Sequence, residues 1–355
     1  MSRLGLVVLL ALLPHAARAD SQPLPAMGAD LTQVSVSGIS SGGFMAAQLA
    51  TAYSATFMGV GVIAAGPYYC AGTYPSIDYL QNATTTCMSP ASPAVTANAT
   101  ASWANAIRFE RKGLIDPVSN LARQHVYVFS GSNDNIVKTM VVNEVPKYYS
   151  LAGARPGNII YDNQTDAGHS IVTDNPSDLA CPDNQSPYIN DCGFKQSQVL
   201  LAHIYGPNVQ APADTPSQAI LRFNQGEFVQ GTRTSMDSDA YAYIPSVCQR
   251  TACAIHVAFH GCKQGATVIG KRFYSGTGYN EFADTNKLII LYPQVHKSKG
   301  IPPNPKGCWD FWGYSSEDQQ HKDFYTKNAP QMKAIMAMLK RLGQPRPALA
   351  SSDSQ

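Results

Sequence analysis

The chain has 355 residues, of which 14% are charged and 44% are hydrophobic, and its formal net charge at pH 7 is +2. A chain so close to neutral lacks the strong positive field that binding to nucleic acid or to an anionic membrane surface requires. Neither class of partner is therefore expected, and we expect a substrate that is uncharged or is recognised by shape and apolar contact.

The first 19 residues have the pattern of a secretory signal peptide. Arg3 is followed by an apolar run over residues 4–13, and the segment ends on Ala-Arg-Ala at residues 17–19. The run is shorter than the roughly 20 apolar residues that span a bilayer, and no later segment is long and apolar enough. A buried N-terminal strand or helix is the alternative interpretation. We expect residues 1–19 to be removed and the chain to be secreted, into the periplasm or the extracellular medium.

Beyond the signal peptide, short strands alternate with helices. The predicted strands are rich in β-branched or aromatic residues and end at turn-forming residues. They are residues 32–38, 58–66, 124–131, 158–163, 240–246, 254–261 and 288–294. The predicted helices are the apolar segment 44–54 and the amphipathic segment 331–342. This alternation predicts an α/β fold in which helices cover both faces of a mostly parallel central sheet.

Polar, proline-rich stretches interrupt this pattern at residues 206–218 and 298–306, and both are expected to be loops. The first is expected to join the two halves of the fold. The tail at residues 346–355 is expected to be disordered.

All eight cysteines follow the signal peptide. An even number of cysteines in an exported chain predicts disulfides, although the sequence leaves their connectivity open. Three pairs are close in sequence and flank polar, turn-like stretches, and by elimination the remaining two cysteines would join. These pairs are Cys70–Cys87, Cys181–Cys192, Cys248–Cys253 and Cys262–Cys308. Since no C-x-x-C pair occurs, zinc-ribbon and thioredoxin-like interpretations lose their main support. No cluster of residues at metal-ligand spacing and no phosphate-binding loop occurs either, so we expect neither a metal site nor another cofactor.

The sequence Gly38-Ile39-Ser40-Ser41-Gly42 is a G-x-S-x-G motif between a predicted strand and a predicted helix. Glycines at these two places permit a tight turn that exposes the serine hydroxyl at the carboxyl edge of a sheet. The motif alone is a weak signal, and a glycine-rich turn without chemistry is the alternative. The strand–turn–helix context favours Ser40 as a nucleophile.

A serine nucleophile needs a base to take its proton and an acid to orient that base. In α/β-hydrolases these residues follow one another in the order serine, acid, histidine. Asp134 comes just after the predicted strand 124–131, and His169 comes in the loop after the predicted strand 158–163. Chain order and strand context therefore predict Asp134 as the acid and His169 as the base.

The other candidate acids and bases fit less well. Asp162 and Asp166 stand too near His169 in sequence for the usual geometry, and His15 belongs to the signal peptide. Five further histidines lie in predicted strands, in a helix-like segment or in polar stretches, where a packed or exposed histidine is the ordinary expectation. They are His125, His203, His256, His296 and His321.

An acyl-transfer site also needs N–H donors for the oxyanion. The first is expected to be the backbone N–H of Ser41, directly after the nucleophile. The second candidate is the turn His260-Gly261-Cys262, which resembles the oxyanion loop of many esterases. That loop normally precedes the nucleophile, whereas here Cys262 follows Ser40 by 222 residues. The reversed order is consistent only with a circularly permuted fold.

Longer blocks resemble one group of secreted hydrolases. AIHVAFHGCKQ (254–264), TGYNEFADTNKLIILYPQ (277–294) and GCWDFWGY (307–314) resemble successive blocks of the secreted polyhydroxybutyrate depolymerase and feruloyl-esterase group. In most of that group these blocks precede the serine. Here SVSGISSGGFMAAQLA (35–50) comes first, which resembles the circularly permuted single-domain polyhydroxybutyrate depolymerases of fungi.

The resemblance implies one catalytic α/β-hydrolase domain at residues 20–345. It implies a triad of Ser40, Asp134 and His169, and an oxyanion hole made by the backbone N–H groups of Ser41 and Cys262. It further implies a Cys262–Cys308 disulfide and a place for Trp309 beside the substrate crevice. A buried core position is the alternative for Trp309.

The implied activity is hydrolysis of short-chain polyhydroxyalkanoate polyester through an acyl-enzyme, by a secreted monomer without a cofactor. An esterase for small or plant-derived esters is the main alternative, because the HGC and GCW blocks are shared more widely. A non-catalytic binding protein of the same fold is the alternative from another class of protein.

Overall fold

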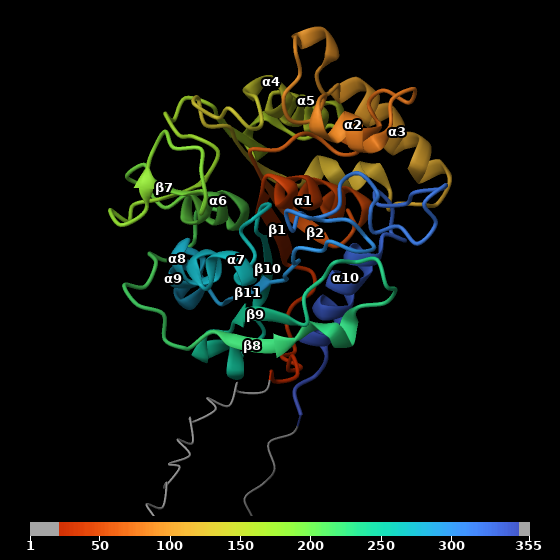
Figure 1. The fold of residues 1–355 in the computed structure, drawn as a ribbon. Coiled ribbons are helices and arrows are strands. Elements are labelled where there is room, and N and C mark those ends of the chain that lie inside the picture. The colour runs from red at the N-terminus through yellow and green to blue at the C-terminus, as the bar shows by residue number, and fades with distance from the viewer. Residues whose placement is uncertain (1–20, 348–355) are drawn as a thin grey trace, which may run out of the picture.

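The computed structural model describes residues 21–347 (Figure 1). The predicted signal peptide and most of the predicted tail lie outside the described residues. Between residues 21 and 347, no helix is long and apolar enough to cross a membrane.

Eight strands form one central sheet. In spatial order they are β4 (Ile159–Asp162), β3 (His125–Phe129), β2 (Phe57–Ile63), β1 (Val34–Ile39), β10 (Ala254–Phe259), β11 (Leu288–Tyr292), β9 (Asp239–Tyr243) and β8 (Leu221–Asn224). The first six strands in this spatial order, from β4 to β11, pair in parallel. At the other edge β9 pairs antiparallel with both of its neighbours, β11 and β8. The predicted, mostly parallel sheet is thereby confirmed.

The central strands are apolar along their length because both faces of the sheet are covered. Every residue of β1 and of β11 is buried, and such unbroken burial is typical of parallel strands between two helical layers. β10 pairs with β1 in parallel, with Val34 opposite Ile255, although the two strands are far apart in the chain. This pairing brings the turn at residues 260–262 beside Ser40.

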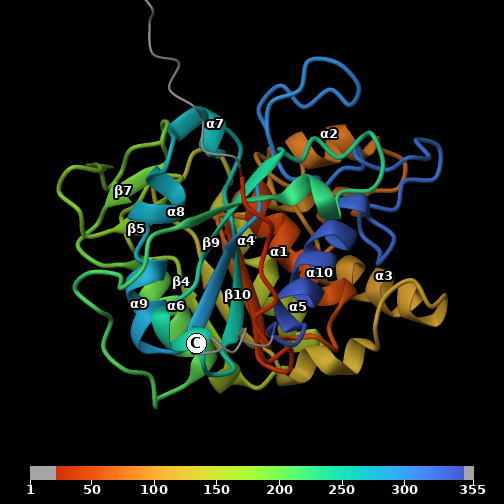
Figure 2. The same ribbon diagram turned by 90° about the horizontal axis from the view of Figure 1, so that it is seen from below.

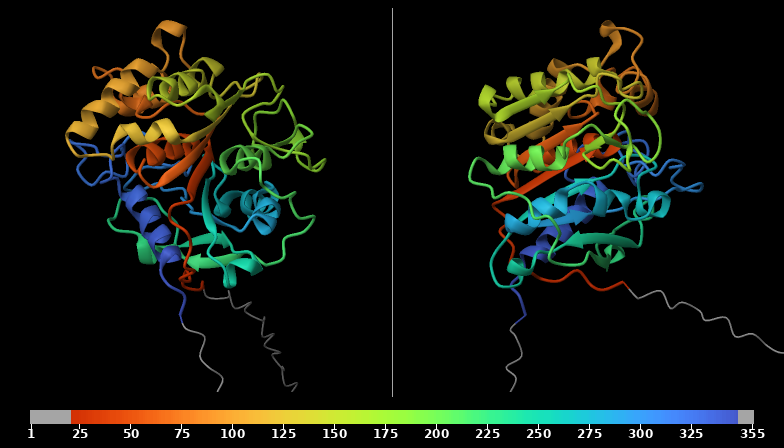
Figure 3. Two further views of the ribbon diagram at one scale, coloured as in Figure 1. Left: turned by 180° about the vertical axis from the view of Figure 1, so that it is seen from behind. Right: turned by 90° about the vertical axis from the view of Figure 1, so that its left-hand side faces the viewer.

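Helices cover both faces of the sheet (Figures 2 and 3). One face carries α1 (Ser41–Ala52), α3 (Ala99–Arg111), α5 (Glu144–Leu151) and α10 (Pro330–Gly343), and the other carries α6 (Gln196–Tyr205), α8 (Arg272–Gly276) and α9 (Tyr279–Thr285). Three short helices are α2 (Tyr79–Thr84), α4 (Thr139–Val142) and α7 (Ala266–Ile269). All of α1 is buried, since its glycines and alanines let it approach the sheet closely on one side and other helices on the other. The predicted cover of helices on both faces is confirmed.

Some parts of the fold do not follow from the sequence patterns. β8 is one, and a small parallel sheet in the order β5 (Ile171–Thr173), β7 (Ile189–Asp191), β6 (Leu179–Ala180) is another. These strands have only two to four residues, too few for an alternating pattern to be visible. The small sheet follows His169 directly.

Four disulfides link the described residues, and they are the four pairs expected from the sequence. They are Cys70–Cys87, Cys181–Cys192, Cys248–Cys253 and Cys262–Cys308. The first three close short local loops, whereas the fourth joins two loops at the carboxyl edge of the sheet.

Candidate active site

Ser40 occupies a sharp turn between β1 and α1. Its φ is 56°, in the left-handed region that residues other than glycine rarely adopt. Close contacts require both glycines of the motif. A Cβ on Gly38 would lie 2.3 Å from the carbonyl oxygen of Gly42, and a Cβ on Gly42 would lie 2.4 Å from the carbonyl oxygen of His260. The turn therefore has the strained strand-to-helix geometry of a nucleophile elbow.

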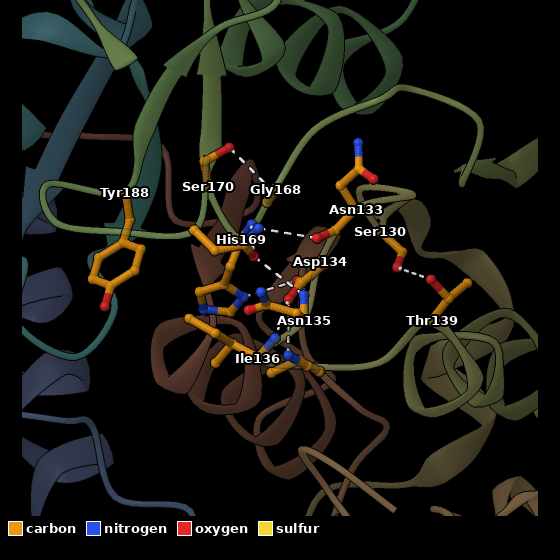
Figure 4. Close-up of polar contacts among 12 residues, drawn as sticks. Ser130, Asn133, Asp134, Asn135, Ile136, Thr139, Gly168, His169, Ser170 and Tyr188 are labelled. Atoms are coloured by element: carbon orange, nitrogen blue, oxygen red, sulfur yellow. Dashed lines mark hydrogen bonds and ion pairs between the residues drawn. The ribbon is translucent and has the colours of Figure 1, made fainter. Parts of the chain in front are cut away.

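Asp134 and His169 form a hydrogen-bonded pair (Figure 4). His169 Nδ1 lies 2.8 Å from Asp134 Oδ2, and both side chains are almost completely buried. The other oxygen of Asp134 accepts hydrogen bonds from the backbone N–H groups of Ile136 and Val137, each at 2.9 Å. The carboxylate is thus fixed in orientation and holds the imidazole by Nδ1. The remaining nitrogen, Nε2, is left to accept a proton.

The ends of neighbouring strands place Ser40 at the same edge of the sheet as this pair. Ile39 of β1 pairs with Ile63 of β2, and Ile63 pairs with Phe129 of β3. Ser40 and the loop that carries Asp134 therefore begin at the same level. Ser40 Oγ makes no hydrogen bond with any residue from 21 to 347. In hydrolases without substrate the serine–histidine contact is often long and tightens only in the reacting complex.

Two backbone N–H groups beside Ser40 are available to a substrate oxygen. Ser41 is the first residue of α1, where an N–H has no acceptor within the helix. Cys262 lies in the turn after β10, and neither N–H donates to another group in the described part of the chain. The turn is close to the nucleophile, since a Cβ on Gly261 would lie 3.2 Å from the Cβ of Ser40. The structure thus brings together Ser40, Ser41 and Cys262; their catalytic roles stay predictions.

Cys308 and Trp309 contact the two residues whose N–H groups are available, Cys262 and Ser41. Cys308 is bonded to Cys262, and the backbone N–H of Trp309 donates to Ser41 Oγ at 3.2 Å. The indole of Trp309 is 0% exposed and packs on Phe259, with ring centroids 4.7 Å apart. In this structure Trp309 has the surroundings of a core residue, as the alternative interpretation expects. Its contact with substrate stays a prediction.

His260, in the same turn, is buried and neutral. Burial lowers its pKa from 6.5 to about 4. Its Nδ1 lies 2.7 Å from the carbonyl oxygen of Gly261, and its Nε2 lies 3.3 Å from the backbone nitrogen of Val295. A neutral imidazole with its proton on Nδ1 satisfies both contacts, whereas the imidazolium would have no acceptor for the Val295 N–H. His260 therefore anchors the turn and is not a second base.

A second histidine, His256, is also buried, and the two buried histidines should make the stability of the fold depend on pH. His256 contacts the hydroxyls of Ser35 and Ser37 through its two ring nitrogens, each at 2.7 Å, and burial lowers its pKa to about 3. His256 and His260 stay neutral in the folded chain, but in the unfolded chain they take up protons below a pH of about 6.5. Their contribution to stability is complete above that pH and is lost as the pH falls towards their folded pKa values. Denaturant titrations at pH 7.5 and pH 4.5 should show a fall in the free energy of unfolding of about 2–3 kcal/mol per histidine.

His256→Asn is the matched variant for this measurement. It removes one titrating group, so we expect lower stability at pH 7.5 but a weaker dependence on pH. A variant that loses stability with pH as steeply as the parent chain would contradict the prediction.

The rival acids and bases have other roles. Asp162 accepts hydrogen bonds from Gln164 and Thr165 in the turn after β4, and Asp166 is bound by Ser132 and Asn133. His321 pairs with Asp318 on the exposed surface. Among residues 21–347, no group of three or more potential ligands could hold a metal ion.

Two amide side chains at the site were not identified from the sequence. Asn184 accepts a hydrogen bond from the backbone N–H of His169, and Gln264 accepts one from the backbone N–H of Gly261. Gln264 belongs to the HGCKQ block, so the resemblance indicates that its surroundings belong to the site but does not indicate what Gln264 does. Asn184 lies in a loop that carries no motif.

An elbow serine, a buried carboxylate–imidazole pair and two available N–H donors thus lie at one edge of a mostly parallel sheet between helical layers. This combination defines the class of the protein, an α/β-hydrolase.

Known proteins narrow the class to a family. No protein-family model matches the chain. It is 41% identical over 329 residues to a poly(3-hydroxybutyrate) depolymerase of Delftia acidovorans, covering 90% of this chain and 61% of that relative. It is 36% identical over 344 residues to a polyhydroxybutyrate depolymerase of Talaromyces funiculosus, covering 92% of this chain and 94% of the relative.

Solved structures agree with the sequence relatives. The crystal structure of the PHB depolymerase from Penicillium funiculosum matches 91% of this chain and all of its own, with a TM-score of 0.78 at 34% identity. A PHB depolymerase variant complexed with an R3HB trimer matches with a TM-score of 0.79, again at 34% identity. The chain belongs to the polyhydroxybutyrate depolymerase family.

Proposed function

We propose that this chain is a secreted serine esterase that hydrolyses short-chain polyhydroxyalkanoate polyester, poly(3-hydroxybutyrate) in particular. The observation that carries the proposal is the buried Asp134–His169 pair at the same sheet edge as the elbow serine Ser40. Membership of the polyhydroxybutyrate depolymerase family supports the choice of substrate. The chain spans 61% of the length of the Delftia relative. The proposed activity therefore rests on the site residues that this chain itself contains.

The proposed reaction begins with a proton transfer. His169 Nε2 takes the proton of Ser40 as the serine oxygen attacks the ester carbonyl, and Asp134 stabilises the imidazolium that forms. His169 then gives the proton to the departing alkoxide of the hydroxyacid unit. The acyl group is left on Ser40, and water cleaves it with His169 again acting as the base.

Negative charge develops on the carbonyl oxygen in both steps. The N–H groups of Ser41 and Cys262 are proposed to donate to that oxygen, and losing one such donor typically costs about 10²–10³ in turnover. The positive end of α1 adds to the stabilisation, because Ser41 is its first residue. These residues supply every proton and acyl transfer of the reaction, and we propose that no cofactor takes part.

We also propose that the fold is circularly permuted. The strand order supports this, because β10 and its oxyanion turn lie beside β1 while following it in the chain. A single catalytic domain at residues 20–345, acting as a monomer, belongs to the same proposal. Trp309 is proposed to border the crevice through the Cys262–Cys308 linkage.

Export completes the proposal. Residues 1–19 have the signal-peptide pattern, and four disulfides persist best in an oxidising compartment. Periplasmic and extracellular residence fit these features equally.

A suspension of poly(3-hydroxybutyrate) granules tests the function. We expect the purified chain to clear the suspension and to release soluble hydroxybutyrate acids, and also to hydrolyse a p-nitrophenyl short-chain ester. Hydrolysis of the small ester without any clearing would make the chain an esterase for small esters. The absence of both activities in a folded protein would leave only a binding function.

A further inference from the structure

The segment between Cys181 and Cys192, here called the bridging segment, contacts the backbone of the base and of the residues on either side of the acid through Asn184. Asn184 Oδ1 accepts hydrogen bonds from the backbone N–H of His169 at 2.9 Å and from that of Asn135 at 3.1 Å. One side-chain oxygen therefore joins the residue that carries the imidazole to the residue that follows Asp134.

The nitrogen of the same amide completes the link. Asn184 Nδ2 donates to the carbonyl oxygen of Asn133 and to that of Pro182, each at 3.0 Å. Asp134 is thus held on both sides, through Asn133 before it and Asn135 after it. All four hydrogen-bonding positions of the amide are used, so no other natural side chain of this size reproduces its contacts.

Backbone packing leaves these loops little freedom. A Cβ on Gly168 would lie 2.1 Å from the carbonyl oxygen of Asp183, and a Cβ on Gly131 would lie 2.1 Å from that of Ala167. The N–H of Gly168 also donates to the carbonyl oxygen of Cys181 at 2.8 Å. The loop after β3 that carries Asp134 (the acid loop), the loop after β4 that carries His169 (the base loop) and the bridging segment are therefore in direct backbone contact.

The far end of the bridging segment reaches the oxyanion turn. Gln264 Nε2 donates to the carbonyl oxygens of Pro187 and Tyr188, at 2.9 and 3.0 Å, while its Oε1 accepts from the N–H of Gly261 at 2.6 Å. The side chain is buried. The Tyr188 ring lies 5.8 Å from the His169 ring, edge to face (Figure 4). One segment thus contacts both the base and the turn that packs against Ser40.

We propose that the bridging segment is a positioning element: its Asn184 fixes the acid–base pair, and its residues Pro187 and Tyr188 hold Gln264, which fixes the oxyanion turn relative to that pair. The inference rests on the proposed function, because it assigns Asn184 and Gln264 to the same hydrolytic site. Neither residue is placed to touch the reacting atoms, so both act through the groups they hold.

Asn184→Ala is the first test. A displacement of about 1 Å in a catalytic group can cost on the order of a hundred-fold in rate. We expect kcat for a soluble p-nitrophenyl ester to fall by about ten- to a hundred-fold, with KM changed by less than about twofold, since the substrate surface is untouched. Labelling of Ser40 by an organophosphate should slow by a similar factor, because it needs the same base.

The pH profile separates positioning from simple loss of structure. A looser contact between Asp134 and His169 stabilises the imidazolium less, so the dependence of kcat/KM on pH should differ from that of the parent chain. Gln185→Ala is the matched control. Gln185 lies on the surface of the same segment, and its amide contacts only Asp183, at 3.3 Å. The control should match the parent chain in kcat and in pH profile.

Asn184→Asp serves if the alanine variant does not fold. It has the same shape and keeps acceptors for His169 and Asn135, but it loses both donors, and the same fall in kcat at unchanged KM is expected. Variants at Asn184 that behave like Gln185→Ala would overturn the proposal. Loss of folding in both variants would do so too, by making the segment a general stability element. Failure of the esterase function itself is distinguishable, because the parent chain would then hydrolyse no ester, or would hydrolyse it no faster than Ser40→Ala and His169→Ala.

Discussion

Replacing Ser40 with alanine should abolish ester hydrolysis while the fold is retained. Loss of the nucleophile from a triad costs on the order of a million-fold in kcat, and the remaining rate comes from substrate binding and the oxyanion hole. The fold should persist because Ser40 Oγ makes no hydrogen bond with the described residues. The substitution should not relieve the backbone strain at position 40, because alanine there would keep the positive φ of Ser40.

Initial rates with a p-nitrophenyl short-chain ester measure this effect, and thermal unfolding checks the fold. Ser132→Ala is the control, because Ser132 is an exposed serine of the acid loop whose hydroxyl contacts only Asp166. It should keep nearly full activity. More than a few per cent of the parent rate in Ser40→Ala would place the nucleophile elsewhere.

His169→Ala should cost about as much as loss of the serine, again on the order of a million-fold. Without the imidazole no group takes the serine proton, and the buried carboxylate of Asp134 loses its partner. An organophosphate should therefore label Ser40 very slowly in the variant. Labelling at the parent rate would remove His169 from the role of base.

The chain offers a matched control for this substitution. His321 also contacts an aspartate, Asp318, through Nδ1 at 2.9 Å, but on the exposed surface. His321→Ala removes a histidine–aspartate pair of nearly the same geometry without touching the site. It should leave both hydrolysis and labelling unchanged.

Local patterns predict the elements that carry the site. Short stretches of sequence, whose composition indicates their secondary structure, predict these elements. They are the motif around Ser40, the strands that precede Asp134 and His169, and the strand that precedes Cys262. Their meeting at one edge follows from parallel pairing, because the carboxyl ends of parallel strands lie together. Local patterns do not predict that Ser40 and Cys262 lie close together. Only the resemblance to permuted depolymerases suggests that β10 pairs with β1.

The remaining parts carry no periodic signal. β5, β6 and β7 are two or three residues long, and Asn184 acts through a side chain in a loop whose path depends on the whole fold. Trp309 shows a different limit. The sequence gives no means of choosing between an aromatic residue at a crevice and one in the core, and the structure places its indole against Phe259.

The most direct test of the central claim is to label the protein with a fluorophosphonate, map the modified peptide by mass spectrometry and follow polymer clearing in the same samples. We expect one adduct per chain, on Ser40, and a loss of poly(3-hydroxybutyrate) clearing in proportion to the labelled fraction. Clearing by fully labelled protein, or an adduct on another residue that accompanies the loss, would contradict the account.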